Sequence, residues 1–546
     1  MNGPRRSATP AISNHRISRR QMLSYASGAL GVAGGLGGSL GYDPRPSVAQ
    51  SPAPNPGGTL VVAGESIGDN FGPAVSFQGW AHVWVVQNVF ESLYTTRDFK
   101  TLIPSLATSY TVSDDGRTYT FQLRKGVKFH DGTPFNAEAV EFNYMRYLDK
   151  NHPYFEPAAV QATSLAMLPQ DVKSVKAIDE YAVQIVRTSP MTAFLAHLCT
   201  SYGGIMSPTS IKKYGVRDVG RYPVGTGPFV FEKGEKGNQA SITAFDGYWG
   251  GRPYLARVVV RVISDERTMT ASLLSGEVDL TPFIDYKDLA SFRKNPNLRV
   301  YTVPAASTGY MAVNQLHPAM KDLRVRRAVC HAIDKQKIID VIFHGEADLG
   351  AGFVPLSVWG YAPELKDYYK YDPQRAKDLL KEAGGPPPQF SLYAQDSGFW
   401  PRLAELMQAD LTAVGFKVPI EKVNSAKFYG LVTEGKHALY IGDMGFNVPE
   451  PQEQFFGQLG CDNPRHRRWG YCDKKWDELL AEQAAERNQE KRRQMVFVLQ
   501  RMLLDAVTHV ANYYNRFSTV ASKRVEGYLP MPVRNMYFHK VHLTKI

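Results

Sequence analysis

Cysteine is scarce in this chain, and so are the motifs that mark common enzymes. Only 4 of the 546 residues are cysteine, which excludes a disulfide-rich scaffold. The sequence has no H-E-x-x-H zinc helix and no G-x-x-x-x-G-K-[ST] phosphate-binding loop. After residue 49, no uncharged apolar run reaches about 18 residues, the length that a membrane-spanning helix needs. The bulk of the chain therefore lacks the marks of a zinc protease, a P-loop NTPase or a membrane-spanning protein.

A strong charge of one sign is also lacking once the start of the chain is set aside. The whole chain has 63 Lys and Arg against 52 Asp and Glu. Residues 1–49 hold six of the arginines and one of the acids, so the remainder carries a net charge of only +6. Short basic clusters at 465–468 and 491–493 have the character of solvated surface, whereas a nucleic-acid binder concentrates basic residues on one face. We therefore expect no nucleic-acid partner.

The first 49 residues have the layout of an export signal. An arginine pair at 19–20 precedes an uncharged, glycine-rich run over 21–42, and small residues at 47–49 suit a signal peptidase. An arginine pair in this place resembles a twin-arginine signal. The alternative is a membrane anchor, which the seven glycines of the run disfavour. We predict that residues 1–49 are cleaved on export to the periplasm and that 50–57 form a linker.

The four cysteines fall into two groups. Cys461 and Cys472 are close in sequence, and in an oxidising compartment they could close a short loop as a disulfide. Two alternatives stay open: free thiols, or a metal site that adds His466. The metal site is disfavoured because it has no evident fourth ligand and lacks the tight spacing of structural zinc sites. Cys199 and Cys330 lie in apolar segments and are expected in the core.

Hydrophobic periodicity predicts both strands and helices in the first half of the chain. Alternating apolar residues at 118–123 and 181–187 predict strands. Residues 136–148 have helical spacing, with Asn136 as the expected N-cap. Residues 234–237 lie between two strand-like segments and are expected to form a hairpin turn.

The second half has an α/β pattern. Asp372 followed by Pro373 predicts a helix start. A predicted strand at 389–395, a helix at 401–415 and a strand at 416–423 follow in that order. Such a unit is long enough for a right-handed crossover between parallel strands.

One short motif could indicate catalysis. Residues 64–68 read G-E-S-I-G, which fits the G-x-S-x-G nucleophile elbow and would make Ser66 a nucleophile. That turn requires a helix directly after the serine, but Gly68, Gly72 and Pro73 predict a loop there. A non-enzymatic role is therefore favoured over a secreted serine hydrolase, and the sequence predicts no catalytic residue, metal or cofactor.

Several long blocks resemble one protein family, and they occur in that family's order. Residues 102–146, 223–265, 273–280 and 310–347 resemble successive blocks of the extracytoplasmic solute-binding proteins of family 5, which include the peptide- and nickel-binding proteins of ABC importers. The resemblance runs in order from about residue 58 to 530, which makes it more specific than any single short motif. It implies a monomeric binding protein that delivers a small solute to an ABC permease in the membrane. A solute sensor without transport fits the resemblance equally.

The resemblance also implies an α/β fold: a two-lobe periplasmic-binding-protein clamp with a discontinuous first lobe and an inserted subdomain. Crossing strands near 303–310 and 510–515 would form a hinge, and closure of the lobes would bury the ligand. The implied boundaries are 58–95, 231–304 and 512–546 for lobe I, 96–230 for the inserted subdomain, and 305–511 for lobe II.

Loops from both lobes are the ligand-binding segments that the resemblance implies. The loop after the first strand offers Phe71 and Phe77, for which a place in the core is an equal alternative. The segment before the 401–415 helix and the block at 442–451 offer the remaining candidates, which are Asp396, Trp400, Arg402, Asp443, Met444, Phe446 and Asn447.

Asn447 bears on the class of ligand. In peptide binders of the family the 442–451 block resembles W-G-A-D-Y-P-D-P, and its first Asp meets the amino terminus of the peptide. When the blocks are aligned on their Pro-acid-Pro ends, that Asp falls at Asn447, whose amide cannot form an ion pair with an ammonium group. Asp443 is the candidate to replace it. A peptide, a modified peptide, a metal chelate and an oligosaccharide therefore all stay open as ligands.

Overall fold

The structure is a computed structural model, and it describes most of the chain after the predicted signal segment. The predicted signal segment 1–49, all but one residue of the linker and the candidate Phe77 lie outside the described residues. The described residues are 57–73, 79–157, 171–200, 203–385 and 389–545.

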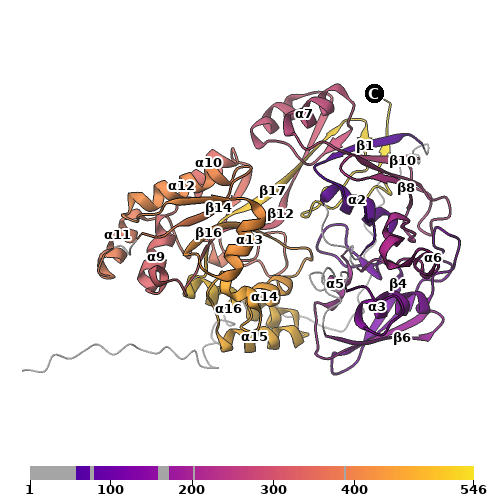
Figure 1. Cartoon of the computed structure of the whole chain (residues 1–546), viewed down its shortest axis with the longest axis horizontal. Helices are drawn as coiled ribbons and strands as arrows, with labels where there is room; N and C mark the ends of the chain where they lie inside the picture. Colours follow the sequence, from indigo (N-terminus) through magenta and orange to yellow (C-terminus); the bar gives the residue numbers. More distant parts are fainter. Residues whose placement is uncertain (1–56, 74–78, 158–170, 201–202, 386–388, 546) are drawn as a thin grey trace, which may run out of the picture. The chain divides into compact units, whose positions relative to one another are not determined.

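One 11-stranded mixed sheet runs through the molecule, in the order β15-β14-β16-β12-β17-β11-β1-β10-β9-β8, with β13 also paired to β17 (Figure 1). We call the half that contains β1 and β8 to β11 lobe I, and the half that contains β14 to β16 lobe II. The strands are β1 (Thr59–Gly64), β8 (Phe229–Glu235), β9 (Gln239–Ala244), β10 (Arg257–Val262), β11 (Leu280–Thr281), β12 (Leu298–Val313), β13 (Ala347–Leu349), β14 (Leu392–Gln395), β15 (Ile420–Val423), β16 (Leu439–Gly445) and β17 (His509–Ser522).

The two longest strands, β12 and β17, belong to both lobes. They pair antiparallel along their length; β17 also pairs with β11 of lobe I, and β12 also pairs with β16 of lobe II. Their register shifts twice, between Pro304 and Thr308 and between Gly309 and Tyr310. Both shifts fall within residues 303–310, the segment predicted as the hinge.

Lobe I is built around β1, whose apolar residues Leu60 and Val62 are fully buried. β1 pairs in parallel with β10, and the apolar helix α2 packs on β8, β9 and β10. The other elements on this side are α2 (Trp80–Val89), α7 (Glu266–Ser275), η3 (Tyr286–Asp288), α8 (Leu289–Lys294), β18 (Val525–Glu526) and β19 (His542–Leu543).

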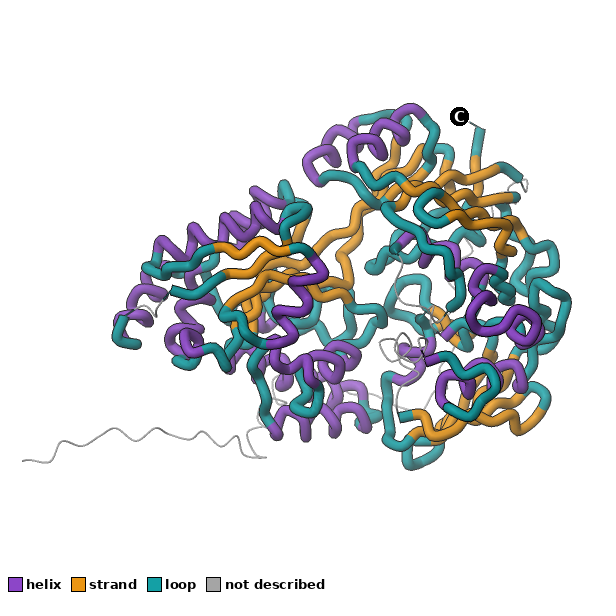
Figure 2. Tube along the Cα trace, in the orientation of Figure 1, coloured by secondary structure: helices purple, strands orange, loops and turns teal. Residues whose placement is uncertain are grey.

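Helices flank the strands of lobe II (Figure 2). The parallel pair β14 and β15 is joined by α12, which confirms the predicted crossover, and Asp372 caps α11 as predicted by accepting from the Arg375 N–H at 2.8 Å. The helical elements are η4 (Pro318–Met320), α9 (Leu323–Ala332), α10 (Lys335–Ile342), η5 (Pro363–Leu365), α11 (Pro373–Glu382), α12 (Trp400–Ala413), α13 (Ser425–Glu434), α14 (Gln452–Gln458), η6 (Pro464–Arg468), α15 (Lys474–Ala485) and α16 (Gln489–Ala506).

A second, four-stranded antiparallel sheet in the order β4-β5-β7-β6 forms the inserted subdomain. Its helix α3 begins after Asn136, whose side chain accepts from the Ala139 N–H at 3.0 Å, as the sequence predicted. The elements of this region are β2 (Tyr94–Thr95), β3 (Ile103–Pro104), β4 (Ala107–Val112), β5 (Thr118–Leu123), α3 (Ala137–Leu148), β6 (Val172–Asp179), β7 (Ala182–Arg187), α5 (Phe194–Leu198), α6 (Pro208–Asp218) and η2 (Val219–Arg221).

Among the helices of the described residues, none combines the length and the apolarity that crossing a bilayer requires. Cys330 is buried and Cys199 is partly buried against the subdomain core, in line with the sequence.

The hinge strands predict a specific response to substitution at Gly309. This residue of β12 faces Tyr513 of β17, and a Cβ atom at residue 309 would lie 2.0 Å from the Tyr513 Cζ atom. Tyr513 is fully buried and cannot move aside, so Gly309→Ala should lower the free energy of unfolding by about 1–3 kcal/mol. Urea denaturation measures the change. Gly445→Ala on β16 is the matched control, because a Cβ there meets nothing within 4 Å. Equal effects from the two substitutions would contradict the packing at Gly309.

Candidate functional site

Polar side chains from both lobes gather beside β12 and β17. We call them the hinge cluster: Glu65, Tyr286, Ser307, Asp443, Tyr513, Asn515 and Arg534. Hydrogen bonds join three of these residues, and the charges of the others act on one another's pKa values. The cluster therefore brings together segments from nearly the whole length of the folded chain.

Asp443 of β16 is held in place by two hydrogen-bond donors from the hinge strands. The Ser307 hydroxyl donates to its Oδ1 atom, and Asn515 Nδ2 donates to its Oδ2 atom at 2.6 Å. Asn515 also donates to the Ser307 hydroxyl at 3.0 Å, which closes a small network. The position of the carboxylate is therefore fixed by side chains from β12 and β17.

Asp443 is exposed to solvent and is also closely surrounded by protein. The surrounding protein raises its pKa by desolvation. The hydrogen bonds from Ser307 and Asn515 and the charge of Arg534 act in the opposite direction. A carboxylate that is accessible but largely surrounded by protein can accept a further charge-assisted hydrogen bond.

Gly309 explains why Asp443 and Tyr513 come close together. It pairs with Asp443 on one side and with Tyr513 on the other, so the three residues share one face of the sheet. The missing side chain at Gly309 leaves room for the Tyr513 ring. The hydroxyl of Tyr513 is buried and has no hydrogen-bond partner among the described residues.

Lobe I supplies three further members of the hinge cluster, which are Glu65, Tyr286 and Arg534. Glu65 directly follows β1; burial raises its pKa, and the charge of Arg534 and the backbone N–H groups of Glu65 and Trp80 lower it. Tyr286 of η3 packs edge-on against Phe343, and burial raises the pKa of its hydroxyl. Arg534 lies in the segment between β18 and β19.

Met444, Phe446 and Asn447 contact other parts of lobe II. Met444 and Phe446 are buried in a hydrophobic core. Asn447 donates through its side chain to Glu453 Oε1 at 2.6 Å and through its backbone N–H to Glu453 Oε2 at 3.0 Å. Of the four candidates in this block, Asp443 is the one that belongs to the hinge cluster.

Asp396, Trp400 and Arg402 lie at the start of α12. Asp396 and Arg402 are exposed, and Trp400 stacks on Phe399 with ring centroids 4.6 Å apart. Among the described residues, these three form no hydrogen bond or ion pair with the hinge cluster. Ring contacts nevertheless continue from Phe399 through Phe343 to Tyr513, at 5.5 and 4.4 Å. That contact path connects Trp400 indirectly to the cluster.

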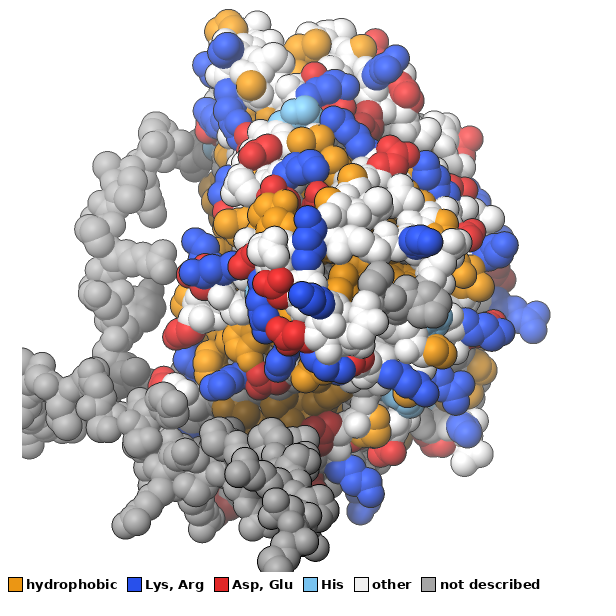
Figure 3. Space-filling model, turned by 90° about the vertical axis from the view of Figure 1, so that its left-hand side faces the viewer, with side chains coloured by type: hydrophobic (Ala, Val, Ile, Leu, Met, Phe, Trp, Pro, Cys, Tyr) orange, Lys and Arg blue, Asp and Glu red, His pale blue; other side chains and the backbone are white. Residues whose placement is uncertain are grey.

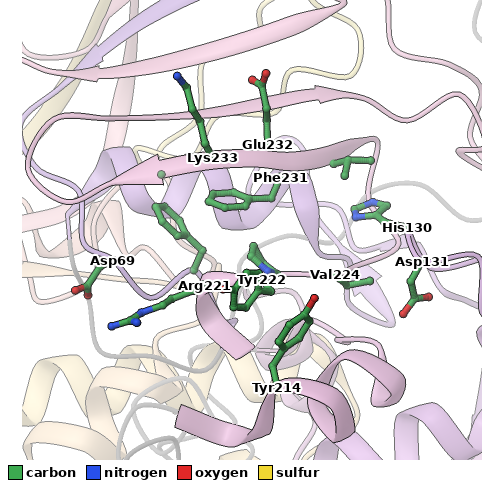
Figure 4. A pocket seen from close by; sticks show the side chains of 14 residues that line it. Asp69, His130, Asp131, Tyr214, Arg221, Tyr222, Val224, Phe231, Glu232 and Lys233 are labelled. Carbon is green, nitrogen blue, oxygen red and sulfur yellow. The ribbon is translucent and has the colours of Figure 1, made fainter. Parts of the chain in front are cut away.

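Phe71 is buried, and its ring packs between His82 and Phe231. It also lines a cavity of about 630 Å³ whose walls come from lobe I and the subdomain (Figure 4). The cavity wall includes stacked Tyr214 and Tyr222, with ring centroids 4.2 Å apart.

Two polar side chains at this cavity already form hydrogen bonds within the protein. His130 bonds through its two ring nitrogens to the Gly225 N–H and the Gly227 carbonyl, and burial lowers its pKa to about 4. Asp131 accepts from the Ser207 hydroxyl at 2.6 Å. None of the residues that line the cavity belongs to the hinge cluster, and its walls combine aromatic rings with charged side chains such as Asp69, Arg221 and Lys233.

Ser66 does not have the surroundings of a nucleophile elbow. Within the described residues, the first helix after it is α2, which begins at Trp80. A Cβ atom on Gly79 would lie 1.9 Å from Ser66 Oγ, so the hydroxyl is packed against the helix start. Within the described parts of the chain, no hydrogen bond joins Ser66 to a histidine or a carboxylate.

Cys461 and Cys472 form a disulfide bond. His466, the third residue of the alternative metal site, bonds through Nδ1 to the Asn463 carbonyl at 2.7 Å. In the part of the chain that the structure describes, no group of three or more His, Cys, Asp and Glu side chains could hold a metal ion.

Hydrogen bonds also join the subdomain to lobe II away from the hinge. The Thr192 N–H donates to the Ala484 carbonyl at 2.8 Å, and its hydroxyl donates to the Glu486 carbonyl at 3.0 Å. Arg487 donates to the carbonyls of Ser113 and Asp114. The lobes are therefore linked both through the strands that they share and through these polar contacts.

One surface of the molecule shows both signs of charge. On the face in Figure 3, Lys and Arg side chains are interspersed with Asp and Glu and with apolar side chains. No continuous basic stripe is visible on the described residues of this face.

Comparison with known proteins decides the family. The model for "Bacterial extracellular solute-binding proteins, family 5 Middle" matches residues 101–465. The chain belongs to family 5 of the bacterial extracellular solute-binding proteins. The predicted family and the two-lobe clamp fold are thereby confirmed.

Curated relatives of this family 5 chain cover nearly its whole folded length. Di/tripeptide-binding protein 2 of Pseudomonas aeruginosa is 30% identical over 512 residues, which are 89% of this chain and 95% of that protein. Heme-binding protein A of Haemophilus influenzae is 30% identical over 488 residues, which are 85% of this chain and 88% of the relative.

Solved structures of the same family are similar in fold. DppA of Helicobacter pylori, in complex with the peptide STSA, aligns with a TM-score of 0.78 and 27% identity over 90% of this chain and 99% of that one. HbpA2 of Haemophilus parasuis aligns with a TM-score of 0.80 and 27% identity over 89% and 100%.

Six of the seven hinge-cluster residues of this family 5 protein are not among the sequence candidates: Glu65, Tyr286, Ser307, Tyr513, Asn515 and Arg534. Glu65 lies within the G-E-S-I-G segment, where attention falls on the serine. The other five lie 221 or more residues after Glu65 in the chain, so no local motif connects them to it. The order of the strands in the sheet brings their segments together. No local signal marks Arg534.

Glu453 of α14 should make the free energy of unfolding of the protein depend on pH. Its carboxyl is 8% exposed, and burial raises its pKa from the ordinary value of 4.5 to about 7. The native protein therefore binds this proton more tightly than the unfolded chain does, so stability should fall as the pH rises from about 4.5 to about 7. The slope from this group is at most about 1.4 kcal/mol per pH unit. Unfolding of wild type and Glu453→Gln across this range should show a shallower slope for the variant. Parallel profiles would contradict this assignment.

Proposed function

We propose that this protein is the substrate-binding component of an ABC importer and that it captures a peptide or a peptide-like solute. The solute would bind between the lobes, and the loaded protein would deliver it to a membrane permease. Export to the periplasm, with cleavage of residues 1–49, belongs to the same proposal. So do a monomeric state and the domain boundaries given above.

Asp443 is the observation that carries the proposal. It is an exposed carboxylate held by Ser307 and Asn515, which belong to the two strands that the lobes share. An ammonium group is the ligand chemistry that such a carboxylate favours. The sequence at residue 447 carries an amide where peptide binders have the carboxylate, and Asp443 offers the missing charge nearby.

The relatives support a peptide-like ligand, but they do not all bind the same class of ligand. A curated relative is described as a di/tripeptide-binding protein, and a solved relative holds the peptide STSA. Another relative is described as a heme-binding protein. An ammonium-bearing solute agrees with the first two descriptions and with the fixed carboxylate.

Binding of free peptides tests the proposal directly. The purified mature protein, from which the cargo has been removed by unfolding and refolding, is mixed with a library of di- and tripeptides, and bound masses are read by native mass spectrometry. We expect at least one peptide to be retained and its affinity to fall by about tenfold or more in Asp443→Asn, because the ion pair is lost. Asp378→Asn, an exposed carboxylate of α11, is the control and should bind like wild type. Retention of no peptide would contradict the proposal.

The alternative hypothesis, a secreted serine hydrolase that uses Ser66, has its own test. A fluorophosphonate probe labels activated serines, and the packing of Ser66 against the start of α2 leads us to expect no labelling. Labelling that disappears in Ser66→Ala would replace the binding function with an enzymatic one.

A further inference from the structure

The short helix η6 of lobe II carries three arginines, Arg465, Arg467 and Arg468. Arg467 is exposed, and the other two are partly exposed. Within the described residues, no carboxylate oxygen lies within 4.0 Å of a side-chain nitrogen of any of the three. Burial lowers the pKa of Arg465, and the charge of Arg468 lowers it further, so these two cations lie near each other. Three neighbouring positive charges are therefore left without an ion-pair partner among the described residues.

The backbone that carries these arginines is fixed from several sides. The disulfide bond between Cys461 and Cys472 closes the segment that contains η6. Trp469, which directly follows η6, is fully buried. His437 Nε2 bonds to the carbonyl of Arg468 at 2.9 Å. Binding through these arginines therefore does not have to order the backbone, which lowers its entropic cost.

Exposed apolar side chains lie beside the same helix. Leu316, Tyr429 and Phe456 are 57%, 51% and 43% exposed. Single exposed apolar side chains are ordinary on a protein surface, whereas a group of them indicates a contact surface. Leu316 directly follows Gln315, whose N–H donates to the Trp469 carbonyl at 3.4 Å.

Hydrogen bonds also connect the segments of Phe456 and Tyr429 to η6. Asn463 Nδ2, at the start of η6, donates to the Phe456 carbonyl at 2.9 Å. Arg468 Nη2 donates to Thr433 Oγ1 at 2.9 Å, and that hydroxyl donates to the Tyr429 carbonyl at 2.7 Å. We call the six side chains the basic-apolar patch: Leu316, Tyr429, Phe456, Arg465, Arg467 and Arg468.

The size and the chemistry of the basic-apolar patch favour a lipid surface over a protein partner. A stable protein interface uses about 20–30 residues on each side, far more than these six. An anionic bilayer has no such minimum, because each basic residue near its surface strengthens binding by about fivefold. Guanidinium groups pair well with phosphate oxygens, and exposed apolar side chains can enter the boundary between headgroups and acyl chains.

We propose that the basic-apolar patch binds the phosphate headgroups of an anionic bilayer surface. Lipid contact goes beyond the proposed function, because solute capture does not require it. It would keep the protein close to the membrane in which a permease lies. It does not depend on which solute the protein binds.

Sedimentation with lipid vesicles tests this surface. The purified mature protein is mixed with vesicles of phosphatidylcholine alone or of phosphatidylcholine and phosphatidylglycerol in equal parts. Wild type should bind the anionic vesicles at least about tenfold more tightly than the neutral ones. High salt should reverse this binding, because salt screens exposed charges.

Two double variants separate the charged from the apolar contribution. Arg465→Gln with Arg467→Gln should weaken binding to the anionic vesicles by about tenfold or more. Tyr429→Ser with Phe456→Ser should weaken it by about fivefold while the effect of salt persists. The control, Lys173→Gln with Lys176→Gln, removes two exposed positive charges from β6 and should bind like wild type.

Three results would contradict lipid binding by this patch. They are equal binding of wild type to both kinds of vesicle, unchanged binding in the double arginine variant, and an equal loss in the lysine control. If the double arginine variant fails to fold, unchanged binding in Arg467→Gln alone overturns the role of the arginines. Binding to native membranes that protease digestion of those membranes abolishes, without binding to pure lipid, would instead identify a membrane protein as the partner. No peptide is added in this experiment, so its failure is distinct from a failure of the proposed function.

Discussion

The antiparallel pairing of β12 with β17 is the constraint on which the rest of the molecule depends. These two strands are shared by both lobes, so each lobe's sheet is completed by chain that also belongs to the other. The same strands supply Ser307 and Asn515, which hold Asp443. The interaction that joins the lobes therefore also orients the carboxylate that we propose meets the ligand. A change in register along the strands would alter fold and site together.

The candidate site holds charged side chains whose desolvation costs free energy, and it contains contacts that offset part of this cost. The surrounding protein disfavours the charged forms of Asp443, Glu65 and Arg534, so it raises the pKa of the two carboxyls and lowers the pKa of the arginine. Hydrogen bonds from neighbouring strands offset part of this cost for Asp443, and ring contacts hold Arg534. A binding protein benefits from such groups because a ligand of complementary charge recovers interactions that the empty site lacks.

Local sequence signals predicted local structure well. Asn136 and Asp372 cap the helices that they were expected to cap, and the strand–helix–strand unit ending at β15 forms the predicted parallel pair. The site was harder to predict, because its residues meet through long-range strand order. Asp443 belongs to a block that the sequence analysis singled out, whereas Ser307 and Asn515, which hold its carboxylate, lie 136 and 72 residues away in the chain. The block that contains Asn447 suggested ligand contact; in the structure its amide donates to Glu453, and the contact with a ligand stays a prediction.

A crystal structure of the mature protein with the cargo that it carries from its own compartment would test the central claim most directly. Our account predicts electron density between the lobes, with an ammonium group within hydrogen-bonding distance of Asp443. Cargo in the cavity beside Tyr214 and Tyr222, with water alone at the hinge cluster, would contradict it.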